Sequence, residues 1–445
     1  MKNVLLIGLA KTGVSTIKYL SKMASNVVVN DIKTKEDLKE ILEDLKEIEN
    51  IEYILGKHIE NVENIDLVVV SPGVPLDLPF IKNIKEKVEI IGEVELSYRL
   101  SNLPKIIGIT GTNGKTTTTS LVSSIFKEAK EDVFTVGNIG NPVIDTVDVA
   151  TKESVLVTEL SSFQLESIDT YKPHISAILN FSEDHLNRHH TMEEYIKAKC
   201  NIYKNQDEND YLILNYDDIL VRNLRDTKAK KIYFSCDSIL EKGVYLDENE
   251  DIIINIDKKI NLMNKNELKI KGKHNVQNAM AGIAISYIYG IDVSIIKNAL
   301  KNFSGVEHRQ ELVKNINGIT FINDSKATNP DSSIKAINSY ENIILIAGGM
   351  DKENDFENLL ENAKGRVKSL VLLGETSQKI KDLALKKGFD DVNIVANMKE
   401  AVSMSYEKAN EGDIVLLSPA CASWDMYKSF EVRGRDFKEN VNSLK

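Results

Sequence analysis

The sequence predicts an α/β protein of three domains: a Rossmann-like N-terminal domain, a central P-loop mononucleotide-binding domain and a Rossmann-like C-terminal domain. Short apolar runs rich in β-branched residues alternate with helical stretches, a pattern typical of parallel sheets covered by helices. The length of 445 residues corresponds to about three domains of roughly 150 residues each. A glycine-rich turn between a predicted strand and a predicted helix has the order of a phosphate-binding loop.

The first domain is expected over residues 1–100 and begins like a dinucleotide-binding βαβ unit. A strand at Val4–Ile7 leads through a glycine-containing turn, Gly8–Gly13, into a helix that ends near residue 23, and a second strand follows. Ala10 stands where the middle glycine of the dinucleotide fingerprint would be, and Asp31 lies near the expected position of the ribose-binding acid. NAD binding, binding of another nucleotide and a Rossmann-like fold alone all remain open.

Two further segments complete this domain. The strand Leu67–Val70 ends at the turn Ser71-Pro-Gly73, and the lysine- and glutamate-rich segment 33–49 is interpreted as a solvated helix face. The stretch Asn102-Leu-Pro104 precedes the next strand and is a plausible domain boundary.

The central domain, residues 101–303, contains the phosphate-binding loop. The strand Ile106–Ile109 is followed by the turn Gly111–Gly114 and a helix that opens at Thr116. Backbone N–H groups and the helix N-terminus would surround an anion. Lys115 would reach the outer phosphates and the Thr116 hydroxyl would bind magnesium. Ile109 replaces the first glycine of the common pattern, so the motif has the shorter Gly-x-x-Gly-Lys-Thr form. The loop predicts binding of a nucleoside triphosphate.

Polar residues follow other predicted strands of this domain, namely 133–136, 154–159 and 175–179. Ligands gather beyond the carboxyl ends of parallel strands, where the turns 137–140, 159–164 and 180–185 would lie. Glu159 is therefore a candidate magnesium ligand, and His185 is a candidate functional residue. His189 and His190 are interpreted as loop residues. Segment 207–270 is expected to form peripheral strands, before a helix at 276–289 that ends at Gly290.

Lys199 stands out because of its place on a predicted helix. Thr191 and Glu194 form a capping box at the helix start, and Lys199 falls within the apolar stripe that contains Tyr195 and Ile202. Burial lowers the pKa of a lysine, and the neutral amine can react with carbon dioxide to form a carbamate, which is an oxygen ligand for a metal. The alternative is a lysine whose ammonium group extends to solvent.

The third domain, residues 304–445, repeats the strand–helix alternation, with strands at 319–322, 343–346, 370–373, 392–395 and 414–417. Polar clusters lie beside these strands at 308–309, 323–329, 348–352 and 418–423. Their lysine, arginine, threonine and serine side chains suit a small dianionic ligand.

Composition limits the function classes. The formal net charge of −11 argues against nucleic-acid binding, and three scattered cysteines fit a reducing compartment. The apolar N-terminal run is broken by Gly8 and ends at Lys11, so it is not interpreted as a signal peptide. No run reaches the ~20 residues that span a bilayer. We expect a cytoplasmic monomer without membrane partners.

Four motifs in this order resemble those of the Mur ligase family: Gly111-Thr-Asn-Gly-Lys-Thr, Glu159-Leu-Ser-Ser-Phe-Gln-Leu-Glu166, Asn323-Asp-Ser-Lys-Ala-Thr-Asn329 and Leu417-Ser-Pro-Ala-Cys-Ala-Ser423. The resemblance covers nearly the whole chain, and the last three motifs favour the branch that adds D-glutamate. It implies an ATP- and Mg²⁺-dependent ligase, with two metal sites, that joins D-glutamate to UDP-N-acetylmuramoyl-L-alanine through an acyl phosphate, and a carbamylated lysine at Lys199.

The resemblance also implies roles for individual residues. Lys115, His185 and Lys199 would be catalytic, and the metal ligands would be Thr116, Glu159, His185 and Lys199. ATP contacts would come from Gly111, Thr112, Asn113, Gly114, Lys115, Thr116, Thr117, Asn275, Asn278, Arg309 and Asp324. The UDP-substrate would contact Thr12, Asp31, Ser71, Gly73 and Asn138, and D-glutamate would contact Thr328, Lys352, Ser423 and Phe430. Ile32-Lys33 replaces a more polar Thr-Arg pair of the family. The sequence therefore departs from the family pattern among the residues that would contact the uridine.

Other function classes remain to be separated by experiment. An NAD-dependent dehydrogenase would use Gly8 to Asp31 but leaves the phosphate loop and Lys199 unexplained. A non-catalytic nucleotide switch would leave the third domain unused. Among ligases, a folylpolyglutamate-synthase-like enzyme or a Mur ligase with a different amino acid are the nearest alternatives.

Overall fold

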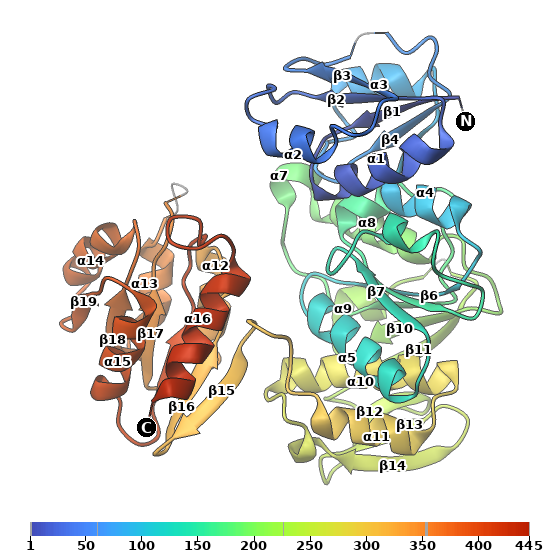
Figure 1. Ribbon diagram of the computed structural model, residues 1–445. Helices are drawn as coiled ribbons and strands as arrows, with labels where there is room; N and C mark the ends of the chain where they lie inside the picture. Colours follow the sequence, from blue (N-terminus) through green and yellow to red (C-terminus); the bar gives the residue numbers. More distant parts are fainter. Residues whose placement is uncertain (1, 60, 226, 352–354, 445) are drawn as a thin grey trace. The chain divides into compact units, whose positions relative to one another are not determined.

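The computed structural model describes residues 2–59, 61–225, 227–351 and 355–444 (Figure 1). The chain separates into two compact units, residues 1–303 and 304–445. The first unit contains two sheets and the second contains one. Parallel strands dominate all three sheets, which confirms the predicted α/β class with Rossmann-like and P-loop folds.

The N-terminal sheet has five parallel strands in the order β3-β2-β1-β4-β5, an order found in doubly wound nucleotide-binding folds. Alternate residues of β1 pack on opposite faces: Leu6 joins one apolar cluster and Leu5 the other. The strands are β1 (Asn3–Ile7), β2 (Asn26–Asp31), β3 (Ile51–Leu55), β4 (Leu67–Val70) and β5 (Ile90–Gly92); the helices are α1 (Lys11–Met23), α2 (Lys39–Asp44), α3 (Pro79–Lys85) and α4 (Glu93–Leu100).

Parts of this sheet differ from the prediction. The expected helix over 33–49 is reduced to the six residues of α2. Strands β3 and β5 were not predicted: β3 is an edge strand with exposed and half-buried residues, and β5 has only three residues. The partial exposure of β3 and the three-residue length of β5 leave neither strand with a clear apolar pattern.

The central sheet has nine strands in the order β14-β13-β12-β11-β10-β9-β6-β8-β7. Along the sheet from β7 through β8, β6, β9, β10 and β11 to β12, neighbouring strands pair in parallel. At the other edge, β12 pairs antiparallel with β13, and β13 with β14. The peripheral strands expected between residues 207 and 270 therefore extend this sheet. The strands are β6 (Lys105–Thr110), β7 (Val133–Gly137), β8 (Val155–Glu159), β9 (Ile175–Ile178), β10 (Tyr211–Asn215), β11 (Lys230–Ser235), β12 (Gly243–Leu246), β13 (Asp251–Asn255) and β14 (Lys259–Asn264).

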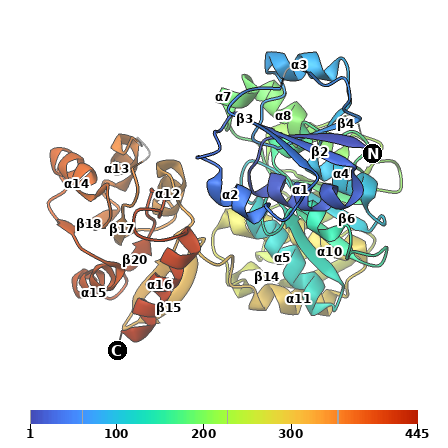
Figure 2. The ribbon, with the colours of Figure 1, turned by 45° about the horizontal axis from the view of Figure 1, so that its top comes forward.

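Helices α5 and α10 lie side by side against this sheet (Figures 1 and 2). Gly282 of α10 permits the close approach, because a Cβ atom there would lie 3.2 Å from Leu121. As predicted, Gly290 ends α10 in a left-handed conformation. The helices are α5 (Lys115–Glu128), α6 (Ser162–Leu165), α7 (Leu186–His189), α8 (Met192–Cys200), α9 (Ile219–Arg222), α10 (Lys273–Tyr289) and α11 (Val293–Asn302), with 3₁₀ turns η1 (Val143–Thr146), η2 (Asn201–Tyr203) and η3 (Lys265–Glu267).

The second unit is a six-stranded sheet in the order β15-β16-β20-β17-β18-β19. All five predicted strands are present, and the antiparallel edge strand β15 was not predicted. Its burial alternates little, which obscures the strand pattern. The strands are β15 (Glu311–Ile316), β16 (Ile319–Asn323), β17 (Ile343–Ala347), β18 (Val367–Leu372), β19 (Val392–Ile394) and β20 (Ile414–Leu417); the helices are α12 (Pro330–Ile337), α13 (Glu357–Ala363), α14 (Ser377–Lys386), α15 (Met398–Lys408) and α16 (Phe430–Ser443).

The described residues also bear on membrane spans and on the state of the cysteines. Across these ranges, no helix combines the length and apolarity that crossing a membrane requires. Cys200, Cys236 and Cys421 are all free thiols.

Candidate active site

The predicted phosphate loop connects β6 to α5, as the sequence order requires. Both of its glycines are needed: a Cβ at Gly114 would lie 2.3 Å from Asn278 Oδ1, and one at Gly111 would lie 3.0 Å from the Leu179 Cβ. Both also have positive φ angles. Gly114 caps α5 without a side-chain hydrogen bond, so the first N–H groups of this helix face the loop. This is the geometry of an anion site at a helix N-terminus.

The side chains of the loop are held by neighbouring segments. Lys115 Nζ donates to the carbonyl oxygens of Gly111, at 2.9 Å, and Thr112, at 2.8 Å. The Asn113 N–H donates to Asn180 Oδ1 at 2.8 Å. Thr116 and Thr117 are buried in the first turn of α5. The loop and its lysine therefore form one preorganised group at the carboxyl end of β6.

Helix α10 contributes two asparagines beside this loop. Asn278 is buried, and its Oδ1 lies 3.3 Å from the Thr118 hydroxyl of α5. Its Nδ2 donates to Asn275 Oδ1 at 3.2 Å. Asn278 is thus adjacent to Gly114, and Asn275 lies against Asn278. The family resemblance implies an ATP contact for each of the two.

Glu159 ends β8 and is 1 % exposed. Its Oε1 accepts a 2.7 Å hydrogen bond from Asn138 Nδ2, whereas its Oε2 is buried and has no hydrogen-bond partner among the described residues. A buried carboxylate oxygen without a partner is costly, and a hard cation such as Mg²⁺ would satisfy it. The donor chemistry at Glu159 therefore fits the expected metal. Asn138, a predicted substrate contact, lies against the same carboxylate.

Lys199 lies inside the apolar stripe of α8, as predicted, and is only 2 % exposed. Its Nζ donates to Gly111 O of the phosphate loop at 2.9 Å and lies 4.8 Å from the centroid of the Tyr195 ring. Burial, with a smaller effect of nearby Lys115, lowers the pKa of Lys199 to about 6, against the opposing charges of Asp184 and Glu159. At neutral pH this amine is mostly uncharged, and it faces the same loop as Lys115.

His185 is less enclosed. It lies at the N-terminus of α7 with φ of 54°, and its side chain is half exposed. Nε2 is 3.6 Å from Asp184 Oδ2, and the ring lies against Phe163, with 4.9 Å between centroids. Among the described residues, neither Glu159 nor His185 belongs to a compact cluster of three His, Cys, Asp or Glu side chains.

The one such cluster in the described ranges is Glu307, His308 and Glu311 of the second unit. The ammonium group of Lys438 lies 2.9 Å from Glu307 Oε1 and 2.6 Å from Glu311 Oε1. A protein cation therefore already neutralises these carboxylates.

His189 corrects the sequence-based prediction of a loop residue. It ends the short helix α7 and is buried, with Nε2 2.9 Å from the Ser162 hydroxyl and Nδ1 3.1 Å from Glu166 Oε1. Burial, with the neighbouring charge of Arg188, lowers its pKa to about 4. Arg188 donates to Glu166 Oε2 at 2.7 Å and to Val74 O at 3.2 Å. The sequence offered no local signal for this group, because its partners come from distant segments.

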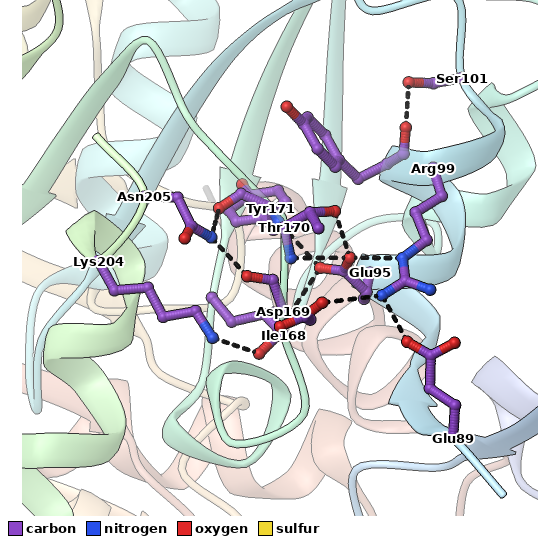
Figure 3. A network of polar contacts seen from close by, with 11 residues as sticks. Glu89, Glu95, Arg99, Ser101, Ile168, Asp169, Thr170, Tyr171, Lys204 and Asn205 are labelled. Carbon is purple, nitrogen blue, oxygen red and sulfur yellow. Dashed lines mark hydrogen bonds and ion pairs between the residues drawn. The ribbon is translucent and has the colours of Figure 1, made fainter. Parts of the chain in front are cut away.

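A second polar network holds the segment 168–171 (Figure 3). Glu95 of α4 accepts hydrogen bonds from the backbone N–H groups of Asp169, Thr170 and Tyr171, each at 2.9 Å, and from Arg99 Nε at 2.7 Å. Burial raises its pKa, but these hydrogen bonds outweigh burial and lower the pKa to about 2.

The carbonyl side of the same segment is held by the residues that follow η2. Lys204 Nζ donates to Ile168 O at 2.7 Å, and Asn205 Nδ2 donates to Asp169 O at 2.6 Å and Tyr171 O at 3.0 Å (Figure 3). Because η2 directly continues α8, the network connects α4 of the N-terminal sheet to the helix that carries Lys199.

Apart from Asn138, which lies against Glu159, the predicted UDP-substrate residues lie in or beside the loops that follow β1, β2 and β4. Asp31 accepts hydrogen bonds from the N–H groups of Leu9, at 2.6 Å, and Lys33, at 2.9 Å. Ser71 donates to Gly8 O at 2.6 Å. Thr12 lies in the first turn of α1, and Gly73 is exposed in the turn after β4. The structure thus brings the loops after β1, β2 and β4 together.

The second unit places Arg309 and Asp324 in adjoining loops. Asp324 follows β16 and is buried: its Oδ2 accepts from the Ser418 hydroxyl at 2.8 Å and its Oδ1 from the Gln310 N–H at 3.2 Å. Burial raises its pKa to about 7. His308 and Gln310 both have positive φ angles, 64° and 44°. Backbone strain on both sides of Arg309 is typical of a functional loop.

Three of the four predicted D-glutamate residues are described. Ser423 is buried in the segment after β20, Thr328 is half-buried in the segment after β16, and Phe430 is the first residue of α16. The Ser325 hydroxyl donates to Phe430 O at 2.8 Å and joins two of these segments. Lys352 lies outside the described residues.

The fold and the phosphate loop agree with what comparison with known protein families shows. Models of three domains match the chain in order: the Mur ligase MurD-like N-terminal domain over residues 2–92, the Mur ligase middle domain over 109–286 and the Mur ligase glutamate ligase domain over 308–421. Relatives align from end to end. The chain belongs to the Mur ligase family.

Two relatives are named UDP-N-acetylmuramoylalanine–D-glutamate ligase. The protein of Clostridioides difficile is 62 % identical over 100 % of this chain and 99 % of its own length. The protein of Alkaliphilus oremlandii is 50 % identical, with the same coverage of both chains.

Solved structures share the fold at lower identity. The UDP-N-acetylmuramate-alanine ligase of Thermotoga maritima is 21 % identical, with a TM-score of 0.59 over 100 % of both chains. A pseudomurein peptide ligase type C from Methanothermus fervidus is 19 % identical, with a TM-score of 0.56 over 100 % of both chains.

Proposed function

We propose that this chain adds D-glutamate to UDP-N-acetylmuramoyl-L-alanine, in an ATP-dependent ligation that serves cytoplasmic peptidoglycan precursor synthesis. The observation that carries the proposal is the 62 % identity, over the full length, to a relative of that name. Support comes from a glycine-rich loop at a helix N-terminus with Lys115 lying over it. A nucleotide switch needs no third domain for an amino acid, so the ligase accounts for more of the chain.

In the proposed mechanism the γ-phosphoryl group of ATP passes to the L-alanine carboxylate of the UDP-substrate, which forms an acyl phosphate. The D-glutamate amine then attacks the acyl carbon, and the tetrahedral intermediate expels phosphate. Phosphoryl transfer depends mainly on positioning and on neutralising charge. The loop N–H groups and Lys115 would supply both to the outer phosphates, and Asn138 would orient the substrate beside Glu159.

Mg²⁺, when bound, would neutralise phosphate charge. We propose Thr116 and Glu159 as ligands of one ion, and His185 with carbamylated Lys199 as ligands of a second. The carbamate assignment is supported by the burial of Lys199, its contact with Gly111 O and its lowered pKa. A neutral amine is the form that reacts with carbon dioxide.

We propose the remaining roles by resemblance to the family. The nucleotide would contact Gly111 to Thr117, Asn275, Asn278, Arg309 and Asp324; the UDP-substrate would contact Thr12, Asp31, Ser71, Gly73 and Asn138; D-glutamate would contact Thr328, Lys352, Ser423 and Phe430. The proposed domains are residues 1–100, 101–303 and 304–445, in a monomer.

The choice of amino acid is tested by phosphate release. The protein is incubated with ATP, UDP-N-acetylmuramoyl-L-alanine and one amino acid at a time: D-glutamate, L-glutamate, L-alanine or L-lysine. Release only with D-glutamate is expected. Release with another amino acid would assign a different Mur ligase activity. Release in a parallel incubation, with a folate and L-glutamate in place of the UDP-substrate and D-glutamate, would assign the folylpolyglutamate-synthase-like alternative.

A further inference from the structure

Arg188 of α7 makes polar contacts with segments from both sheets of the first unit. Its Nη2 donates to the carbonyl oxygen of Val74 at 3.2 Å and to Glu166 Oε2 at 2.7 Å. Val74 follows β4 of the N-terminal sheet, whereas Glu166 ends α6, which follows β8 of the central sheet. The Arg188 side chain is 13 % exposed, so water and salt screen these contacts less than those of a surface arginine.

The position of Arg188 is fixed from the side of the central sheet. Its guanidinium carbon lies over the Phe163 ring, 5.2 Å from the centroid. Glu166 uses its two oxygens for two side chains of α7, because Oε2 accepts from Arg188 and Oε1 lies 3.1 Å from His189 Nδ1. A four-residue helix such as α7 is not stable by itself, so its position depends on these contacts.

The helix that Arg188 holds begins at His185, the proposed ligand of the second metal ion. The Arg188 N–H donates to His185 O at 2.9 Å. The His185 ring lies against the same Phe163 ring, with 4.9 Å between centroids. Because both side chains contact one aromatic ring and belong to one helical turn, a displacement of Arg188 would displace His185 with it.

Val74, the other partner of Arg188, lies next to the first glycine-containing turn of the chain. A Cβ atom at Gly8 would lie 2.8 Å from Val74 Cγ2. The Val74 N–H donates to Ser71 O at 3.0 Å, and the Ser71 hydroxyl donates to Gly8 O at 2.6 Å. The loops that contain Gly8 and Ser71 are those proposed to hold the UDP-substrate. Arg188 therefore links these loops directly to the helix of His185.

The bond to Val74 is not needed to neutralise charge, since Glu166 already pairs with Arg188. What it adds is a connection between residues 114 positions apart in the chain. Because the acceptor is a backbone carbonyl oxygen, the bond fixes the path of the backbone after β4. Hydrogen bonds from a charged donor are stronger than those between neutral groups, so this connection can keep the two segments at a set distance.

We propose that Arg188 is a positioning residue that couples the loops of the UDP-substrate to the helix of His185. A substrate bound to the loops after β1 and β4 then presents its alanine carboxylate to His185, because Arg188 keeps the two at a set distance. The inference rests on the proposed ligase function. Arg188 touches no reacting atom and acts through Val74 and α7.

The kinetic test removes the link and keeps the packing. Arg188→Met retains an unbranched apolar side chain against Phe163 but loses both hydrogen bonds, whereas Arg188→Lys keeps a cation with three donors. Asp77→Asn is the matched control: Asp77 joins the same segment to the end of α7 through an exposed pair with His190 at 3.0 Å, and such pairs contribute little. Phosphate release gives the Michaelis constants for the UDP-substrate and for ATP, and thermal unfolding is measured alongside.

Arg188→Met is expected to raise the Michaelis constant for the UDP-substrate about tenfold, as the loss of a hydrogen bond from a charged group does, and to change that for ATP by less than about twofold. Arg188→Lys should fall between wild type and Arg188→Met, and Asp77→Asn should match wild type. An unchanged UDP-substrate constant in Arg188→Met, or equal rises in both constants, would overturn the proposal.

Hydrogen–deuterium exchange gives a second readout that needs neither metal nor turnover. The UDP-substrate is added without ATP or Mg²⁺, and exchange is followed in residues 71–78 and 185–190. Both segments should become protected in wild type, whereas Arg188→Met should keep the protection of 71–78 and lose that of 185–190. Equal protection of 185–190 in the variant would overturn the coupling, and so would a wild type in which only 71–78 is protected.

Two controls keep the outcomes distinct. Should Arg188→Met not fold because Glu166 loses its cation, the double variant Glu166→Gln/Arg188→Met removes the unpaired carboxylate, and the same results are expected of it. A wild-type protein in which the UDP-substrate protects neither segment and D-glutamate elicits no phosphate release would refute the proposed function, and the coupling with it. A wild type that passes both tests while the variant behaves like it would refute the role of Arg188 alone.

Discussion

The Glu95 network allows a stability effect to be worked out from the structure. Glu95 accepts three backbone N–H groups and the Arg99 guanidinium, and its pKa falls from 4.5 to about 2. That difference corresponds to about 3 kcal/mol of folding stability at neutral pH. Glu95→Gln keeps the size of the side chain but turns an N–H group toward these donors. We therefore expect the variant to lose most of this stabilisation.

The expected loss of folding stability can be expressed as a change in melting temperature. The first unit spans residues 1–303, and about 2.1 cal/mol/K of unfolding entropy per residue gives roughly 0.6 kcal/mol/K. Glu95→Gln should therefore melt about 5 °C below wild type by circular dichroism near pH 7. The carboxylate contributes fully above its unfolded pKa of 4.5 and loses this contribution as the pH falls through about 2. The gap should stay constant down to about pH 5 and narrow below that.

Glu89→Gln is the matched control. Glu89 bonds to the same Arg99 at 2.8 Å, but its side chain is half exposed, and exposed ion pairs contribute at most about 1 kcal/mol. Its melting temperature should fall by less than about 2 °C. The reasoning would be refuted if Glu95→Gln had the same melting temperature as Glu89→Gln. It would also be refuted if the difference in melting temperature between Glu95→Gln and wild type did not change with pH.

Three further predictions concern the site. Lys115→Ala should abolish ATP-dependent phosphate release with little change in melting temperature, whereas Lys127→Ala, exposed on the same helix, should retain activity; normal turnover in Lys115→Ala would remove the lysine from the site. Lys199→Ala should be nearly inactive, and added acetate should partly restore its activity. Lys197→Ala is the control, because Lys197 is exposed on the same helix. Full activity of Lys199→Ala without acetate would exclude the carbamate. Asp324→Asn should gain stability relative to wild type between about pH 4 and pH 7, because burial raises the folded pKa of Asp324 to about 7; a pH-independent melting difference would contradict that origin.

The sequence predicted best what depends on neighbouring residues. The phosphate loop is local, since its strand, glycines, lysine and helix are consecutive. The place of Lys199 in an apolar stripe followed from the 3.6-residue period of a single helix, but the pattern left open whether its ammonium group is buried or extends to solvent. Glu95 and His189 were missed because their partners lie on segments distant in sequence.

The sequence analysis also failed to predict two edge strands, β3 and β15. Strands β3 and β15 alternate weakly between buried and exposed residues, so the two-residue period of a strand is not visible in their sequences. The central strands of each sheet are buried on both faces and were predicted at nearly their observed bounds.

The central claim is that the chain ligates D-glutamate through an acyl phosphate, and isotope transfer tests it most directly. UDP-N-acetylmuramoyl-L-alanine labelled with heavy oxygen in its alanine carboxylate is incubated with ATP, D-glutamate and the protein, and the products are analysed by mass spectrometry. The account predicts a D-glutamyl product and one labelled oxygen in each released phosphate, since the carboxylate oxygen stays bonded to phosphorus when the amine displaces it. Unlabelled phosphate, or no incorporation of D-glutamate, would contradict the account.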